Sequence, residues 1–94
     1  MTGKKIDIGP AGAQLAKNIR TVRTARRLQY KELSDLMESL GRPIAPLGIR
    51  RIESHERRVD VQDLVTLSEA LGFSVDDLVF SDIEVHAEYK LIKA

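Results

Sequence analysis

Residues 19–36, IRTVRTARRLQYKELSDL, and residues 49–58, IRRIESHERR, decide the fold of this chain. Apolar side chains in and around these stretches recur every three or four positions, which is the period of an α-helix with one buried face. The positions on that face are Leu15, Ile19 and Val22, then Leu33, Leu36, Met37 and Leu40, then Ile49 and Ile52. The spacing predicts three helices, over residues 10–27, 30–40 and 46–54.

Capping residues mark two further short helices, at residues 61–71 and 75–80. Asp60 and Ser74 are favoured N-caps, and each is followed three positions later by an aspartate, as in a capping box. Gly41 and Gly72 are natural stops for the second and fourth helices. Five short helices joined by tight turns predict an all-α bundle.

The tail breaks the helical pattern after residue 82. Apolar and polar residues alternate there, which is typical of a β-strand, with Ile83, Val85, Ala87, Tyr89 and Leu91 on one face. A helix remains an alternative, because Ile83, Ala87 and Leu91 are also four residues apart. A lone strand is unstable in water, so we expect a partner for it: the apolar N-terminal arm or the same strand of a second copy.

The composition fits one small globular domain. Of the 94 residues, 43% are hydrophobic and 31% are charged, so the chain can bury a core and keep a polar surface. No apolar run approaches the ~20 residues of a transmembrane helix, and we see no signal peptide. Cysteine is absent, which excludes disulfides, thiolate nucleophiles and cysteine zinc sites. We expect a cytoplasmic protein without a membrane partner.

The net charge of +1 hides a division along the chain. Residues 1–58 contain thirteen lysines and arginines against six acidic residues, a net charge of +7. Residues 59–94 contain two lysines against eight acidic residues, a net charge of −6. This asymmetry favours a basic half that faces a polyanion, with a chance distribution of surface charge as the alternative.

In this order and spacing, the residues resemble the phage-repressor-like (XRE, lambda-repressor-like) helix–turn–helix regulators. The resemblance covers about residues 13–80: residues 19–36 and 49–58 match the first three helices, and residues 59–79, VDVQDLVTLSEALGFSVDDLV, match the fourth and fifth. It implies a five-helix DNA-binding domain at residues 11–80, with the helix–turn–helix at about 30–57. A flexible arm at 1–10 and a dimerisation or interaction tail at 81–94 would flank this domain.

Three features depart from the family pattern. The turn MESLGRPIAP, residues 37–46, is longer than the usual one and is similar to that of a long-turn subgroup. Gln29 and Tyr30 stand where the family has a threonine cap and a glutamine, so Gln29 is expected to cap poorly. Arg27 replaces the usual helix-ending glycine, so we expect it at positive φ.

The resemblance places the first turns of the third helix against DNA base edges. The residues expected there are Pro46, Leu47, Gly48 and Arg50. Arg50 is the main candidate because a guanidinium can bind O6 and N7 of guanine, whereas Leu47 can cover a thymine methyl group and Gly48 would allow close approach. Phosphate contacts are expected from Tyr30, Lys31, Arg42, Arg51, Arg57 and Arg58. For these side chains a solvated surface is the alternative.

The same resemblance places Arg23 of the first helix opposite Glu53 of the third. Such an ion pair would join the two helices and neutralise both charges. We therefore expect Arg23 and Glu53 to have a structural role rather than to contact DNA.

The sequence predicts a regulator that binds double-stranded DNA sequence-specifically, most simply a transcriptional repressor acting as a homodimer on a palindromic operator. The acidic tail is the expected dimer interface, through Ile83, Val85, Ala87, Tyr89 and Leu91. Two alternatives remain. One is a protein-binding adaptor of antitoxin or anti-repressor type that acts through the tail, and the other is a DNA-architectural accessory protein of a mobile element.

Catalysis is not expected. The sequence contains no plausible nucleophile and base pair, no glycine-rich phosphate loop and no convergent carboxylate pair, so it does not indicate an enzyme. We expect no cofactor and, in the absence of a second globular domain, no small-molecule ligand. Glu84, His86 and Glu88 would share one side of the tail strand, where a solvated side is preferred over a metal site.

Overall fold

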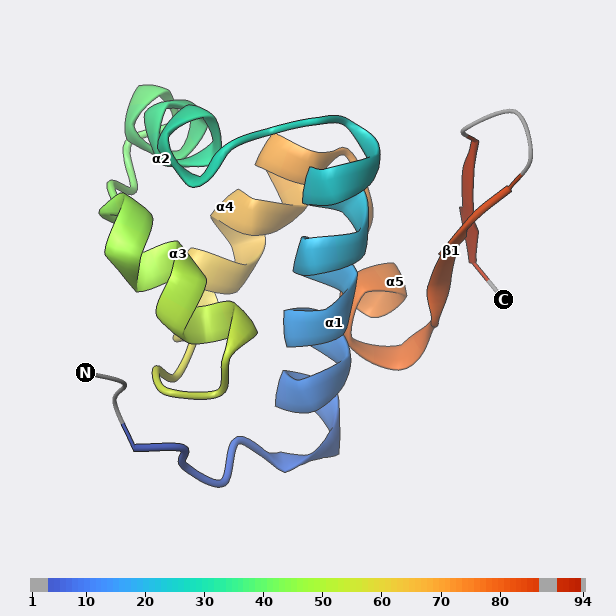
Figure 1. The fold of residues 1–94 in the computed structure, drawn as a ribbon, viewed down its shortest axis with the longest axis horizontal. Helices are drawn as coiled ribbons and strands as arrows, with labels where there is room; N and C mark the ends of the chain where they lie inside the picture. The colour runs from blue at the N-terminus through green and yellow to red at the C-terminus, as the bar shows by residue number, and fades with distance from the viewer. Residues whose placement is uncertain (1–3, 87–89, 94) are drawn as a thin grey trace.

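The computed structural model describes residues 4–86 and 90–93. Within these residues the chain forms five α-helices and one small antiparallel sheet (Figure 1). The elements are α1 (Gly9–Ala25), α2 (Tyr30–Ser39), α3 (Pro46–Glu53), α4 (Val61–Leu71), α5 (Val75–Phe80), β1 (Ile83–Val85) and β2 (Leu91–Lys93). The prediction of a mostly helical chain is confirmed, and each helix begins and ends within two residues of its expected bounds.

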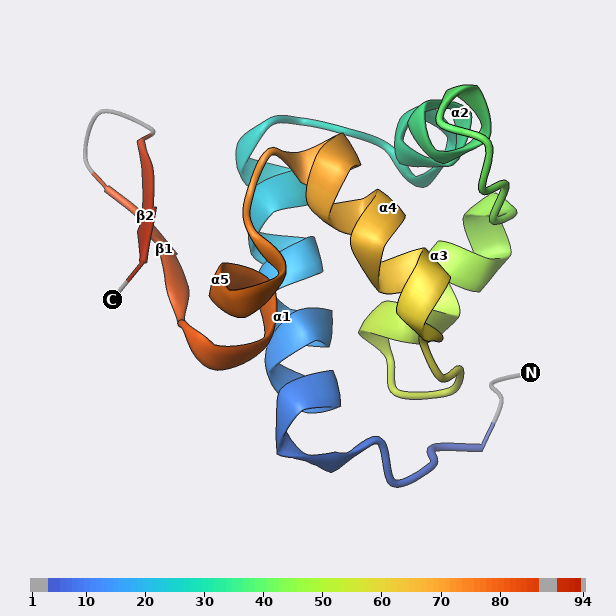
Figure 2. The same ribbon diagram turned by 180° about the vertical axis from the view of Figure 1, so that it is seen from behind.

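Helix α1 is the centre of the fold. It contacts α3 and α4 on one side and α5 and β1 on the other, as Figures 1 and 2 show from opposite directions. The buried core consists of Leu15, Ile19, Val22, Leu33, Met37, Ile44, Ile49, Ile52, Leu67, Leu71, Leu78 and Ile83. Leu36 and Leu40 were expected on the inner face of α2 but are exposed, because Leu33 and Met37, four residues apart, already fill that face.

The helix ends follow most of the sequence signals. The side chain of Asp60 accepts a hydrogen bond from Asp63 N at 2.7 Å, and that of Ser74 accepts one from Asp77 N at 3.0 Å. Arg27 has a φ of 55°, as predicted for a residue in the place of glycine. At the start of α2 the Gln29 side chain makes no capping hydrogen bond, as expected, while the Gln29 backbone N–H donates to Glu32 Oε1 at 2.8 Å.

The tail forms a hairpin, so the prediction of one continuous strand is wrong. β1 and β2 pair antiparallel, with Val85 opposite Leu91 and Ile83 opposite Lys93. The His86 amide continues the ladder by donating to Lys90 O at 2.8 Å. Pairing within the tail satisfies backbone groups that a lone strand would leave open, so β1 takes β2 and not the N-terminal arm as its partner.

The N-terminal arm lies beside α3 and not beside the tail. The Ile6 amide donates to His55 O, 2.8 Å away, in the loop that follows α3. His55 has a φ of 65°, a left-handed conformation uncommon for a residue with a side chain. The first helix already begins at Gly9, inside the stretch predicted as arm.

A buried asparagine attaches the hairpin to the helices. Asn18 of α1 is fully buried, and its Nδ2 donates to Leu78 O at 2.8 Å and Ser81 O at 2.7 Å. Its Oδ1 accepts from Ile83 N at 3.0 Å. One amide side chain therefore satisfies backbone groups at the end of α5 and the start of β1.

Candidate nucleic-acid interface

Helix α3 buries one face and exposes the other. Ile49 and Ile52 are 0% and 2% exposed, whereas Leu47 is 48% exposed. Arg50 and Arg51 share the exposed side with Leu47, and neither makes a hydrogen bond or ion pair through its side chain in the part of the chain described. The helix starts at Pro46, whose fixed φ suits the first turn. This exposed face is the candidate interface.

An ion pair holds the far end of α3. Arg23 Nε lies 2.7 Å from Glu53 Oε2, and Arg23 Nη2 donates to Glu53 Oε1 at 3.1 Å. The two side chains are only 11% and 4% exposed. The hydrogen bond with Glu53 raises the pKa of Arg23, so the guanidinium stays charged. The structure thus brings together the two residues expected to join the first and third helices.

Tyr30 belongs to this internal cluster. Its hydroxyl donates to Glu53 Oε1 at 2.8 Å, and its ring lies under the Arg23 guanidinium, 4.0 Å from Cζ to the ring centroid. Burial and the bond to Glu53 raise the pKa of Tyr30. The hydroxyl expected to meet a phosphate is therefore engaged inside the protein.

Two other expected phosphate ligands, Arg42 and Arg57, face carboxylates of α4. Arg42 Nε donates to Asp63 Oδ1 at 2.8 Å, and its Nη2 donates to Asp60 Oδ2 at 2.5 Å. Arg57 Nη2 lies 3.6 Å from the other oxygen of Asp63, whose side chain is 2% exposed. This cluster joins the long turn after α2 and the loop after α3 to the start of α4. The charges of Arg42 and Arg57 are evident in the sequence, but their pairing with Asp60 and Asp63 is not.

Gly48 also faces the protein. A Cβ at this position would lie 2.8 Å from Ile44 Cγ2 and 3.0 Å from Arg57 Nη1. The missing side chain lets α3 approach its own preceding turn and Arg57, which is a different reason for glycine from the expected approach to DNA.

Replacing Gly48 with alanine should lower the free energy of unfolding by about 1–3 kcal/mol, since the added methyl group overpacks a buried contact. Urea unfolding followed by circular dichroism measures this loss. Leu47→Ala is the matched control: its side chain is exposed, and we expect a change within about 0.5 kcal/mol. Equal urea midpoints for the two variants would contradict the steric assignment.

The remaining expected contacts stay on the surface. Lys31 forms an exposed pair with Asp35 at 3.0 Å, and Arg51 and Arg58 are exposed. Of the residues expected at the dimer interface, Ile83 is fully buried in the core of the chain and Leu91 packs against that core. Val85 is exposed. Ala87 and Tyr89 lie outside the described residues.

The described residues give no sign of a metal site. No group of three potential ligands occurs among them; His86 Nε2 lies 3.8 Å from Glu84 Oε2, and Glu88 lies outside the description. No helix within residues 4–86 and 90–93 is long and apolar enough to cross a membrane.

Comparison with family models, curated proteins and solved structures gives no match for this chain.

Proposed function

We propose that this protein is a transcriptional regulator of the phage-repressor-like helix–turn–helix class, which binds double-stranded DNA and reads the major groove with α3. One observation carries the proposal. Leu47, Arg50 and Arg51 lie exposed on one side of a helix whose other side is buried and held by Glu53. An α-helix fits the major groove, and arginine is the commonest reader of guanine there.

The internal pairs support this assignment. Arg23, Arg42 and Arg57 each bind carboxylates within the chain, whereas Arg50 and Arg51 have no such partner among the described residues. Because Arg50 and Arg51 have no carboxylate partner in this part of the chain, their guanidinium groups are available to bind an external anion. The helix order and the resemblance over residues 13–80 agree with a lambda-repressor-like fold in which α2 and α3 form the helix–turn–helix.

The two exposed arginines should behave differently on DNA. In vitro selection of binding sites at fixed salt should show that Arg50→Ala loses preference at one base pair, by about 1–3 kcal/mol, because a bidentate contact to guanine is removed. Arg51→Ala is the matched control from the same helix, and it should weaken all sites about equally. If Arg50→Ala also weakens every site equally, direct base reading by Arg50 is excluded.

A helix of eight residues reads few base pairs, so we propose a homodimer on two-fold-related half-sites. The hairpin offers exposed Val85 and Ile92, at 46% and 43%, next to strand edges that can pair with a second copy. Deleting the tail is a poor test of this dimer, since deletion also removes the buried side chain of Ile83 from the core.

Ile92→Lys should instead abolish the dimer and weaken operator binding at least tenfold, while the unfolding midpoint stays within about 3 °C, as for a surface change. Sedimentation velocity and operator titration measure the two effects. Ile6→Lys, an equally exposed change on the arm, is the control. If Ile92→Lys leaves operator affinity intact and abolishes capture of another protein, the adaptor alternative replaces the dimer.

A further inference from the structure

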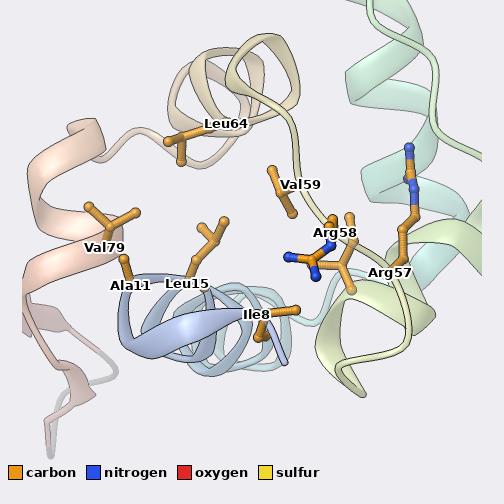
Figure 3. A pocket seen from close by; sticks show the side chains of 10 residues that line it. Ile8, Ala11, Leu15, Arg57, Arg58, Val59, Leu64 and Val79 are labelled. Carbon is orange, nitrogen blue, oxygen red and sulfur yellow. The ribbon is translucent and has the colours of Figure 1, made fainter. Parts of the chain in front are cut away.

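A cavity of about 230 Å³ lies between the start of α1, helices α4 and α5, and the loop after α3 (Figure 3). It is partly open to solvent. Its walls are mostly aliphatic and include Ile8, Ala11, Leu15, Val59, Leu64 and Val79. A cavity of about 150 Å³ with such walls accepts a molecule the size of benzene, so this one has room for a small organic ligand.

Two arginines line this cavity, and only Arg58 has no ion-pair partner among the described residues. Figure 3 shows the Arg58 side chain among the aliphatic side chains of the walls and the Arg57 side chain extending away from them. The Nη2 atom of Arg57 lies 3.6 Å from Asp63 Oδ2. Within the described part of the chain, Arg58 makes no hydrogen bond or ion pair. A guanidinium fork above an apolar cavity matches a ligand with an apolar chain and a planar anionic head.

We propose that this cavity binds a small aliphatic carboxylate of about six to eight carbons, with its chain between Leu15, Leu64 and Val79 and its carboxylate on Arg58. The guanidinium of Arg58, which has no partner in the described part of the chain, matches the charge and the two oxygens of a carboxylate. This proposal differs from the expectation that the protein takes no small-molecule ligand, because the helices of this domain themselves surround a cavity of the required size. The features that support this site do not depend on DNA binding, although Arg58 is also one of the residues expected to contact phosphate.

A homologous series tests the apolar part of the site. Butanoate, hexanoate, octanoate and decanoate are titrated into the full chain, below their micelle concentrations, and followed by calorimetry. Affinity should rise about fourfold for each added methylene until the cavity is full, and then stop rising. No binding by any of the four acids, or a rise that continues unchanged to decanoate, would overturn the proposal.

A matched pair of ligands and of variants tests the carboxylate position. Octanamide should bind at least tenfold more weakly than octanoate, because it lacks the charge that strengthens the bonds to Arg58. Arg58→Met should abolish this preference, whereas Arg20→Met, which removes an exposed arginine that does not line the cavity, should keep it. A preference for octanoate that survives Arg58→Met would overturn the assignment.

Filling the cavity gives a second readout. Val79→Phe should lower octanoate affinity at least tenfold while the helical circular dichroism is kept, because the ring occupies the ligand's space. If Val79→Phe fails to fold, Ala11→Leu places extra carbons at the exposed wall of the same cavity. Octanoate affinity unchanged in the folded filling variant would show that the acid binds elsewhere and would overturn the proposal.

Discussion

Replacing Glu53 with alanine should lower the free energy of unfolding by about 3–5 kcal/mol, the usual loss when one partner of a buried ion pair is removed. The variant leaves the Arg23 guanidinium, whose side chain is 11% exposed, without its counter-charge. It also removes the acceptor of the Tyr30 hydroxyl. Helices α1, α2 and α3 all lose a shared contact, so operator affinity should fall as well. Urea unfolding and an operator titration measure the two losses.

The exposed pair Lys31–Asp35 supplies the control for this prediction. Its side chains are 78% and 62% exposed, so Asp35→Ala should change stability by less than about 1 kcal/mol. The loss of stability in Glu53→Gln should lie between those of Glu53→Ala and Asp35→Ala, since the amide keeps an acceptor but loses the charge. The structural role of the Arg23–Glu53 pair fails if Glu53→Ala leaves both the unfolding midpoint and operator affinity unchanged.

Replacing Asn18 with leucine should lower the free energy of unfolding by about 3–4 kcal/mol, although leucine is close to asparagine in size and favours helix. The substitution leaves the carbonyls of Leu78 and Ser81 and the amide of Ile83 without their partner. Each buried polar group left unsatisfied costs about 1–3 kcal/mol. Thermal and urea unfolding measure the loss, and hydrogen exchange at the Ile83 amide should accelerate more than exchange in α2.

Lys17→Ala provides the comparison one position away on α1. Lys17 pairs with Asp82 at the surface, where its side chain is 52% exposed, so removing it should cost less than about 1 kcal/mol. If Asn18→Leu is as stable as Lys17→Ala, the asparagine does not hold the hairpin to the helices. The hairpin would then be attached by the buried contacts of Ile83.

The helical body could be predicted because its signals are local. Apolar spacing within one helix, and caps such as Asp60 and Ser74, depend on residues three or four positions apart. Such local signals do not specify the structure of the tail. Alternation is the same for one long strand as for two short paired ones, and no glycine or asparagine marks a turn after His86. The sequence pattern therefore does not distinguish a hairpin from a single strand.

The candidate interface was predictable only in its exposed part. The positions of Arg50 and Arg51 follow from the period of α3, which places them opposite Ile49 and Ile52. The partners of Arg42 lie 18 and 21 residues away and depend on how the long turn folds back. Asn18 left one faint signal, a polar residue on the apolar stripe of its helix, where a surface position would not be expected.

The carboxylates at the start of α4 bear on how the proposed DNA binding would depend on salt concentration. Only cations that reach phosphates release the counterions condensed on DNA, and that release sets how steeply affinity falls as salt rises. Arg42 and Arg57 remain on Asp60 and Asp63, and Arg23 remains on Glu53. If the chain binds DNA as proposed, we expect it to displace fewer ions than its count of basic residues implies, and we expect its affinity to fall less steeply as salt rises.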